Sequence, residues 1–134
     1  MSASLRPMAV NPTLKVLLVE DSRVLAERLI ELIHQTASAD LVGHVDNERD
    51  AIAFLKKRNI DVVILDLQLR QGTGFGVLKS LLDALHKPRV LVLTNYDLPE
   101  YRRQATQLGA DYFLDKSREY HRVPEILEQL TPSA

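Results

Sequence analysis

The stretch Asp61-Val-Val-Ile-Leu-Asp-Leu-Gln-Leu69 decides the fold class of this 134-residue chain. Residues 62–65 form an unbroken run of valine, isoleucine and leucine between two aspartates. A short apolar run without polar alternation is typical of a strand buried on both faces, as in a parallel sheet covered by helices. The sequence therefore predicts an α/β fold in which Asp66 directly follows a buried strand.

Strand-like and helix-like stretches alternate on either side of this run. Ser22 can cap the first predicted helix, and Asn47 with Asp50 can cap the second. Five strand–helix repeats with short crossovers predict a doubly wound (βα)5 sheet of five parallel strands. The other predicted strands are residues 15–19, 40–45, 90–94 and 112–114, and the predicted helices are about 23–37, 48–58, 75–86, 98–108 and 119–130.

Composition predicts one ordinary globular domain. The chain is 46% hydrophobic and carries a net charge of −1, so it creates no field that attracts nucleic acid or an anionic membrane. It has no cysteine and no apolar run near the ~18 residues of a membrane span, so we expect a cytoplasmic protein without disulfides. Residues 1–13 are predicted to form a flexible leader, residues 14–130 the domain and residues 131–134 a tail.

Polar residues follow the predicted strands at their carboxyl ends, where chemistry collects in such sheets. Crowded carboxylates repel one another unless a cation holds them. Because the ends carry only oxygen ligands, a hard ion such as magnesium is favoured over zinc. The residues concerned are Glu20 and Asp21 after the first strand, Asp66 after the third, Thr94 at the end of the fourth, and Asp115 with Lys116 after the fifth.

This set of residue types suits the formation of an acyl phosphate. Asp66 can attack phosphorus, Lys116 can supply positive charge and Thr94 a hydroxyl donor. Each residue alone has a simpler reading. Asp66 could be a helix cap, and Glu20 and Asp21 could be helix-start residues whose charge suits the helix dipole. Thr94 could be a strand residue and Lys116 a surface charge.

Four segments resemble the receiver domains of two-component response regulators, and the similarity extends from Lys15 to about Leu130. They are residues 16–22, 61–69, 93–95 and 109–116. The resemblance implies a flavodoxin-like fold with strand order 2-1-3-4-5. It also implies a phosphoacceptor role for Asp66 and a requirement for Mg²⁺ or Mn²⁺.

The same resemblance assigns the remaining site residues. It implies that Asp21 binds the metal directly, that Glu20 acts mostly through water, and that the backbone carbonyl of Gln68 is a further ligand. Thr94 and Lys116 would bind the phosphoryl oxygens. Phe113 matches the switch aromatic of the family, but it has no hydroxyl, so any switch here must rest on packing. The alternative is that Phe113 is simply an aromatic residue of the core.

Two positions depart from the family pattern. Ser117 follows Lys116 where a cis proline is common, so we expect a trans bond there. Arg70 replaces a proline in the loop after the phosphoacceptor, and we expect the loop through Gly72, Gly74 and Gly76 to be more mobile.

Gln68 and Tyr96 lie two positions beyond Asp66 and Thr94, where side chains can flank the attacking water. We hypothesise that Tyr96 partly shields the phosphoryl group and slows its hydrolysis, although a surface tyrosine on the fourth helix is an equal alternative. No histidine is expected at a strand end, so the donor should be a separate histidine kinase, a histidine phosphotransfer protein or a small acyl phosphate. The four histidines are His34, His44, His86 and His121.

Four functions remain in competition. The first is a phosphorylation-controlled module whose fourth helix, fifth strand and fifth helix bind a downstream protein or output domain, or form a phosphorylation-dependent dimer. The second is an adaptor scaffold that works without phosphorylation. The third, a flavodoxin-like or nucleotide-binding enzyme, lacks its glycine-rich phosphate cradle. The fourth is a fragment of a longer DNA-binding regulator, although no basic stripe here would itself bind nucleic acid.

Overall fold

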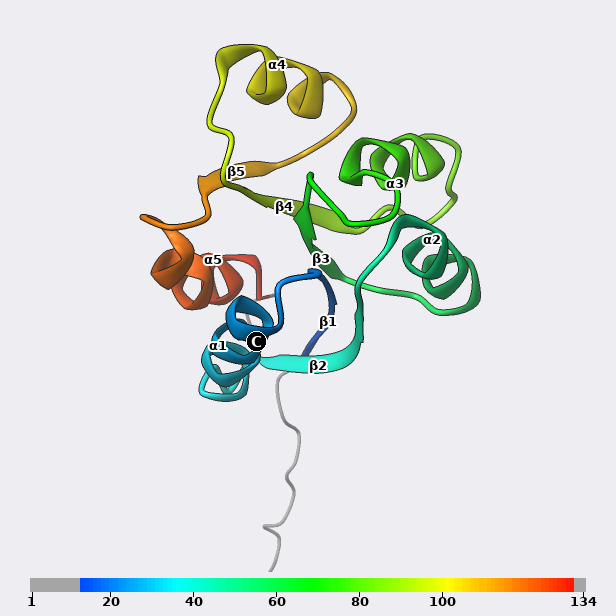
Figure 1. Ribbon diagram of the computed structural model, residues 1–134. Coiled ribbons are helices and arrows are strands. Elements are labelled where there is room, and N and C mark those ends of the chain that lie inside the picture. The colour runs from blue at the N-terminus through cyan, green and yellow to red at the C-terminus, as the bar shows by residue number, and fades with distance from the viewer. Residues whose placement is uncertain (1–12, 132–134) are drawn as a thin grey trace, which may run out of the picture.

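The computed structural model describes residues 13–131, and Figure 1 shows five strands surrounded by helices. The predicted leader and tail lie outside these residues, apart from Thr13 and Thr131. The strands are β1 (Leu14–Val19), β2 (Ala39–Val45), β3 (Val62–Asp66), β4 (Arg89–Thr94) and β5 (Tyr112–Asp115). The helices are α1 (Arg23–His34), α2 (Glu48–Lys57), α3 (Gly74–Ser80), α4 (Pro99–Gln107) and α5 (Val123–Leu130), with a 3₁₀ turn, η2 (Tyr120–Arg122), before α5.

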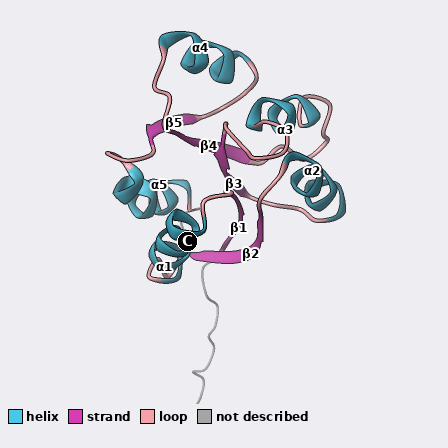
Figure 2. Cartoon of the chain, viewed as in Figure 1, coloured by secondary structure: helices cyan, strands magenta, loops and turns pink. Residues whose placement is uncertain are grey.

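The sheet is parallel throughout, with the order β2-β1-β3-β4-β5. This confirms the predicted fold class and strand order. Figure 2 shows that each crossover between strands contains a helix. Because every strand runs in the same direction, all the carboxyl ends lie along one edge of the sheet, and those of β1, β3, β4 and β5 are neighbours.

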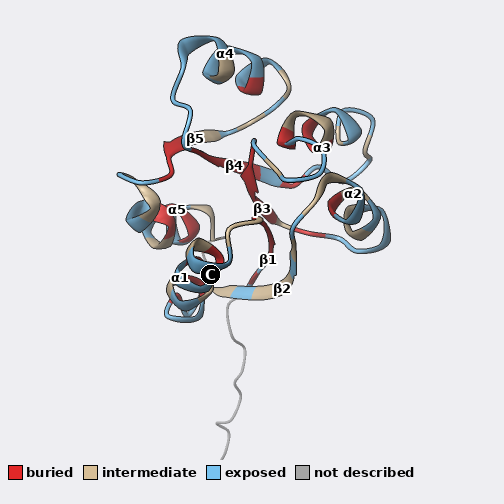
Figure 3. Ribbon diagram, viewed as in Figure 1, coloured by how far each residue is buried: buried red, intermediate tan, exposed pale blue. Residues whose placement is uncertain are grey.

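The core has two halves, one on each face of the sheet. Alternate strand residues, such as Leu18 and Ile64, pack against α1 and α5, whereas Leu17 and Val63 pack on the side of α2, α3 and α4. Figure 3 shows β3 buried between these layers, and β1 and β4 are buried except at Lys15 and Arg89. The unbroken apolar run of residues 62–65 is therefore explained by burial on both faces.

Local signals placed the starts of α1 and α2 correctly. The Ser22 hydroxyl accepts a hydrogen bond from Leu25 N–H, and the Asn47 side chain accepts one from Asp50 N–H, so both predicted caps are confirmed. Helix ends were less predictable. Helix α1 ends at His34 because Thr36 occupies its last carbonyls. The Thr36 hydroxyl donates to the carbonyl of Leu32, and the Thr36 N–H donates to that of Ile33.

Two further boundaries differ from the prediction. Helix α3 ends at Ser80 rather than residue 86, because the chain continues in turns in which Leu81, Leu82 and Ala84 donate to carbonyls three residues earlier. Helix α5 begins at Val123, after η2, rather than at residue 119, with Pro124 in its first turn.

No helix within residues 13–131 has the length and apolar character needed to cross a membrane.

The loop after β3 is also shorter than expected. Gly74 and Gly76 lie in α3, so the prediction that they belong to the loop is wrong. The β3–α3 loop comprises residues 67–73, and only Gly72 among these glycines has a positive φ, of 85°. The Thr73 side chain caps α3 by accepting a bond from Gly76 N–H.

Candidate functional site

The sheet brings the predicted polar residues together at its carboxyl edge. Glu20 and Asp21 follow β1, Asp66 ends β3, Thr94 ends β4 and Lys116 follows β5. The registers Val19–Leu65, Asp66–Leu93 and Thr94–Asp115 align these strand ends. The parallel topology therefore brings these five residues together, as the sequence predicted.

Lys116 is the electrostatic centre of this edge. Its Nζ lies 2.9 Å from Glu20 Oε2 and 2.9 Å from Asp66 Oδ2. All three residues are buried, with 7%, 2% and 2% of their surfaces exposed. Burial by itself lowers the pKa of Lys116, but hydrogen bonds and charge from Glu20 and Asp66 outweigh it and raise that pKa above its ordinary value. The ammonium therefore stays charged between two carboxylates.

Asp66 has the most perturbed carboxyl group. Burial, the largest cause, and the neighbouring Glu20 charge raise its pKa from 3.8 to about 6, against the opposing effect of Lys116. The Asp66 Oδ1 atom accepts a hydrogen bond of 3.0 Å from Gln68 N–H. Near neutral pH the group is ionised but poorly solvated, which suits a carboxylate nucleophile.

The acidic cluster, Glu20, Asp21 and Asp66, fits a hard divalent cation. Each residue can offer a carboxylate oxygen, and the three oxygens lie within 4.8 Å of one another. One lysine balances only part of the charge of three carboxylates, so a divalent cation would offset the remainder. Oxygen donors of this kind suit Mg²⁺ or Mn²⁺.

Thr94 and Phe113, the predicted switch pair, lie on neighbouring strands. Thr94 is fully buried, and its Oγ1 accepts a 3.1 Å hydrogen bond from Tyr96 N–H. Phe113 is 9% exposed and lies beneath the guanidinium of Arg102. Tyr96 is 48% exposed, and its ring meets the ring of Tyr101 edge-on, with centroids 6.4 Å apart. Tyr96 therefore rests on α4 in this conformation.

The segment after Lys116 is held by Asp115, which the sequence placed at this edge without a role, and by Glu119, which the sequence did not single out. Asp115 Oδ1 accepts bonds from Ser117 N–H, Ser117 Oγ and Arg118 N–H. Glu119 accepts a 2.9 Å bond from Asp115 N–H. The hydrogen bond from Arg118 N–H, followed by that from the Ser117 hydroxyl, lowers the pKa of Asp115. An aspartate side chain that accepts from the backbone two residues later is a known turn signal that could have revealed this arrangement.

The Lys116–Ser117 bond is trans, as expected, since residues 13–131 contain no cis peptide bond. One histidine contacts the backbone at this edge of the sheet. His44 is the penultimate residue of β2, and its Nε2 lies 2.9 Å from the backbone carbonyl of Glu20. A carbonyl only accepts, so Nε2 carries the proton in this contact and supports the β1–α1 turn. Arg70 Nη2 also reaches the carbonyl of Asp21, at 3.4 Å.

Comparisons with known proteins agree with this geometry. Residues 16–128 match the family model of the response regulator receiver domain. The chain is 30% identical over 116 residues to sensory transduction protein LytT of Bacillus anthracis, covering 87% of this chain and 46% of LytT. It is 31% identical over 102 residues to the DNA-binding transcriptional activator DevR/DosR of Mycobacterium tuberculosis, covering 76% of this chain and 47% of that protein.

Solved structures give the same result for the fold. The response regulatory domain of protein MrkE from Klebsiella pneumoniae superposes with a TM-score of 0.78 at 26% identity, covering 87% of this chain and 93% of that domain. The chain spans about half the length of the curated relatives it matches.

Proposed function

The chain belongs to the response regulator receiver domain family, and from this premise we propose that it accepts a phosphoryl group on Asp66 in a reaction that requires Mg²⁺ or Mn²⁺. One observation carries the proposal. Lys116 Nζ bridges Glu20 and Asp66 at 2.9 Å each, beside Asp21, at the carboxyl edge of the sheet. The buried Asp66 carboxylate, the Lys116 ammonium and the acidic cluster therefore lie together, which supports this role for Asp66.

In the proposed reaction a carboxylate oxygen of Asp66 forms a bond to phosphorus. The bond between phosphorus and the donor's leaving atom breaks, and the leaving group keeps the bonding electron pair. Lys116, already within hydrogen-bond distance of Asp66, can donate to the oxygens of the transferring group. The Thr94 hydroxyl, which now accepts from Tyr96 N–H, can turn to donate to the same oxygens.

Glu20, Asp21, Asp66 and the backbone carbonyl of Gln68 would hold the divalent cation. When bound, the cation supplies positive charge that offsets the negative charge of the phosphoryl oxygens. Burial around Asp66 and Lys116 strengthens each of these electrostatic interactions because the local dielectric constant is low. The domain would catalyse only its own phosphorylation and dephosphorylation.

Receiver domains are signalling domains that work with kinases and output domains. For this chain we propose a histidine kinase or histidine phosphotransfer protein as donor in the cytoplasm, with small acyl phosphates as substitutes. The output would act through the surface of α4, β5 and α5, where Thr94 and Phe113 would couple to modification of Asp66. The two curated relatives are about twice as long as the region they match, so residues 14–130 would form the receiver part of a regulator.

Intact-mass measurement after incubation with acetyl phosphate tests the proposal. The native chain with Mg²⁺ should gain one phosphoryl group, and Asp66→Asn or an excess of chelator should prevent it. Asp83→Asn, at an exposed aspartate between α3 and β4, is the matched control and should react like the native chain. If the native chain gains no mass under any condition, the result would favour the adaptor that works without phosphorylation.

A further inference from the structure

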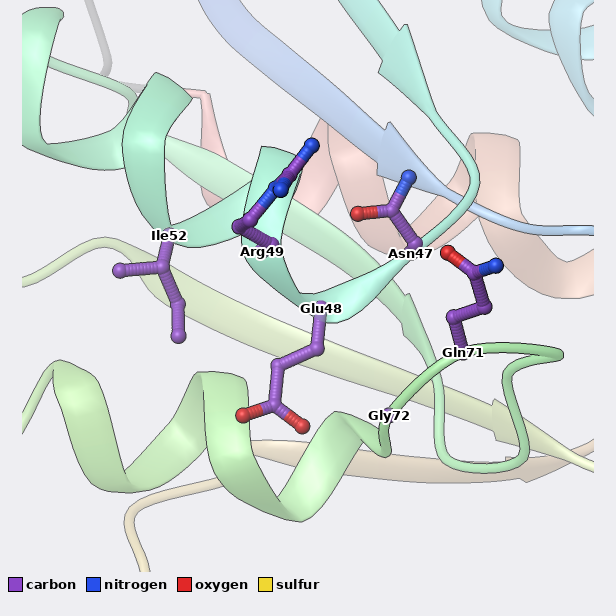
Figure 4. A pocket seen from close by; sticks show the side chains of 6 residues that line it. All are labelled: Asn47, Glu48, Arg49, Ile52, Gln71 and Gly72. Carbon is purple, nitrogen blue, oxygen red and sulfur yellow. The ribbon is translucent and has the colours of Figure 1, made fainter.

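Glu48, the first residue of α2, reaches across to the β3–α3 loop (Figure 4). Its Oε1 accepts a 2.9 Å hydrogen bond from Thr73 N–H. Its own N–H donates to the carbonyl of Gln71 at 3.1 Å. The backbone and the side chain of one residue therefore both hold the far end of the loop that begins after Asp66.

Two glycines leave room for the Glu48 side chain. A Cβ atom at Gly72 would lie 2.4 Å from Glu48 Cβ, and one at Gly76 would lie 2.3 Å from Glu48 Cδ. Both distances are shorter than atoms tolerate. Gly72 is also needed for its φ of 85°, but Gly76 lies in α3, where glycine weakens a helix. The close approach of Glu48 gives a reason for glycine at position 76.

Backbone hydrogen bonds connect the far end of the loop to the residues beside the proposed cation site. Gln68 and Thr73 form an antiparallel bridge, and Gly74 N–H donates to the Leu67 carbonyl at 3.0 Å. Across this bridge Thr73 directs its N–H to Glu48, whereas Gln68 directs its N–H to Asp66 Oδ1. The position of Thr73 therefore determines how the backbone of Gln68 sits beside Asp66.

An open recess borders the loop on this side. Asn47, Glu48, Arg49, Ile52, Gln71 and Gly72 line an open recess of about 530 Å³ between α2 and the loop (Figure 4). The Arg49 side chain there is 94% exposed. Because the recess is open to solvent, the contacts of Glu48 replace the packing that would otherwise hold residues 71–73 against α2.

We propose that Glu48 is a positioning residue for the divalent-cation site. It holds Thr73, and through the Gln68–Thr73 bridge it orients the Gln68 backbone toward Asp66. The inference rests on the proposed function, because it assumes that Glu20, Asp21, Asp66 and the Gln68 carbonyl bind the cation. Outer-shell groups that orient ligands commonly have large effects on metal affinity.

Calorimetric titration with Mg²⁺ alone, on the full chain, tests this role. Glu48→Ala should raise the Kd for Mg²⁺ about 10-fold, the lower end of the range for a lost outer-shell support. Glu48→Gln keeps an oxygen that can accept from Thr73 N–H, so it should bind within about twofold of the native chain. Arg49→Ala removes a neighbouring side chain from the same recess and should leave the Kd unchanged.

Hydrogen exchange and a reciprocal variant separate positioning from general stability. Glu48→Ala should speed exchange of residues 67–74 while circular dichroism shows an intact fold. Gly76→Ala should raise the Kd in the native chain, where the new Cβ meets Glu48, and should have little further effect in Glu48→Ala.

These measurements distinguish a failure of the positioning role from a failure of the proposed function. A native chain that binds Mg²⁺ and a folded Glu48→Ala variant with the same Kd would overturn the positioning role alone. A native chain that binds no Mg²⁺ would overturn the proposed function and this inference with it.

Discussion

The guanidinium of Arg102 lies over the ring of Phe113, with its Cζ atom 4.6 Å from the ring centroid. The same guanidinium donates to Asp97 Oδ1 at 2.9 Å. Helix α4 is thereby tied both to β5 and to the segment that follows Thr94. The sequence predicted that a switch at Phe113 would rest on packing, and Arg102 is the partner that such a switch would have to release or shift.

We predict an energetic coupling between Arg102 and Phe113. Arg102→Gln keeps a polar side chain but removes the charge, and Phe113→Leu removes the ring. In a double-mutant cycle the coupling in the free energy of unfolding should be about 0.5–1 kcal/mol, as for a partly exposed cation–π pair. Urea unfolding measures it. Strict additivity would contradict the contact, and Arg103→Gln, at an exposed neighbouring position, serves as the control.

We predict that Asp66→Asn alters the pH dependence of stability. The pKa of Asp66 is about 6 in the folded protein and 3.8 ordinarily. The carboxyl group therefore contributes stability that is fully present below pH 3.8 and is lost as the pH rises through about 6. Asparagine does not titrate. The free energy of unfolding of Asp66→Asn relative to the native chain should increase from about pH 4 to pH 7.5, by at most about 3 kcal/mol.

Urea unfolding at both pH values, with chelator, measures this difference. At pH 7.5 added Mg²⁺ should reduce the difference between the two chains. A cation that binds only the folded state stabilises it, and Asp66→Asn lacks one of the proposed carboxylate ligands. A difference that does not change with pH would contradict the raised pKa of Asp66.

We predict that Asp115 stabilises the turn after Lys116 through its charge. Its pKa is lowered, so its contribution is present above the ordinary value of 3.8 and is lost as the pH falls through the folded pKa. Asp115→Ala should lower Tm by several degrees at pH 6 and by less at pH 3. Ser117→Ala removes only the hydroxyl donor and should have a smaller effect. An equal loss at both pH values would show that the charge is unimportant.

We predict that Tyr96→Ala shortens the lifetime of the phosphorylated chain. The side chain now rests on Tyr101, and shielding of the phosphoryl group would require it to lean toward Asp66. Tyr96→Phe keeps the ring and should retain the lifetime. The rate at which the phosphoryl mass is lost measures the effect. Equal lifetimes for all three chains would leave Tyr96 as a surface residue of α4. Gln68, two positions after Asp66, offers the corresponding test on the other side.

The polar edge of the sheet could be predicted because it depends on local pattern and on topology alone. An apolar run such as residues 62–65 marks a buried strand, and parallel strands bring their carboxyl ends to one edge. The caps at Ser22 and Asn47 were equally visible, because a cap involves only residues a few positions apart. Helix ends such as that of α3 were not, because competing turns of similar energy decide them.

By itself the sequence determined which segments are strands, and therefore that Asp66 and Lys116 meet at one edge. Only the tertiary structure decided the contacts of Glu48 with Thr73, of His44 with the Glu20 carbonyl, and of Arg102 with Phe113. These pairs come from different elements, so neither spacing nor period encodes them. The raised pKa of Asp66 belongs with them, because burial and the distance to neighbouring charges exist only once the chain has packed.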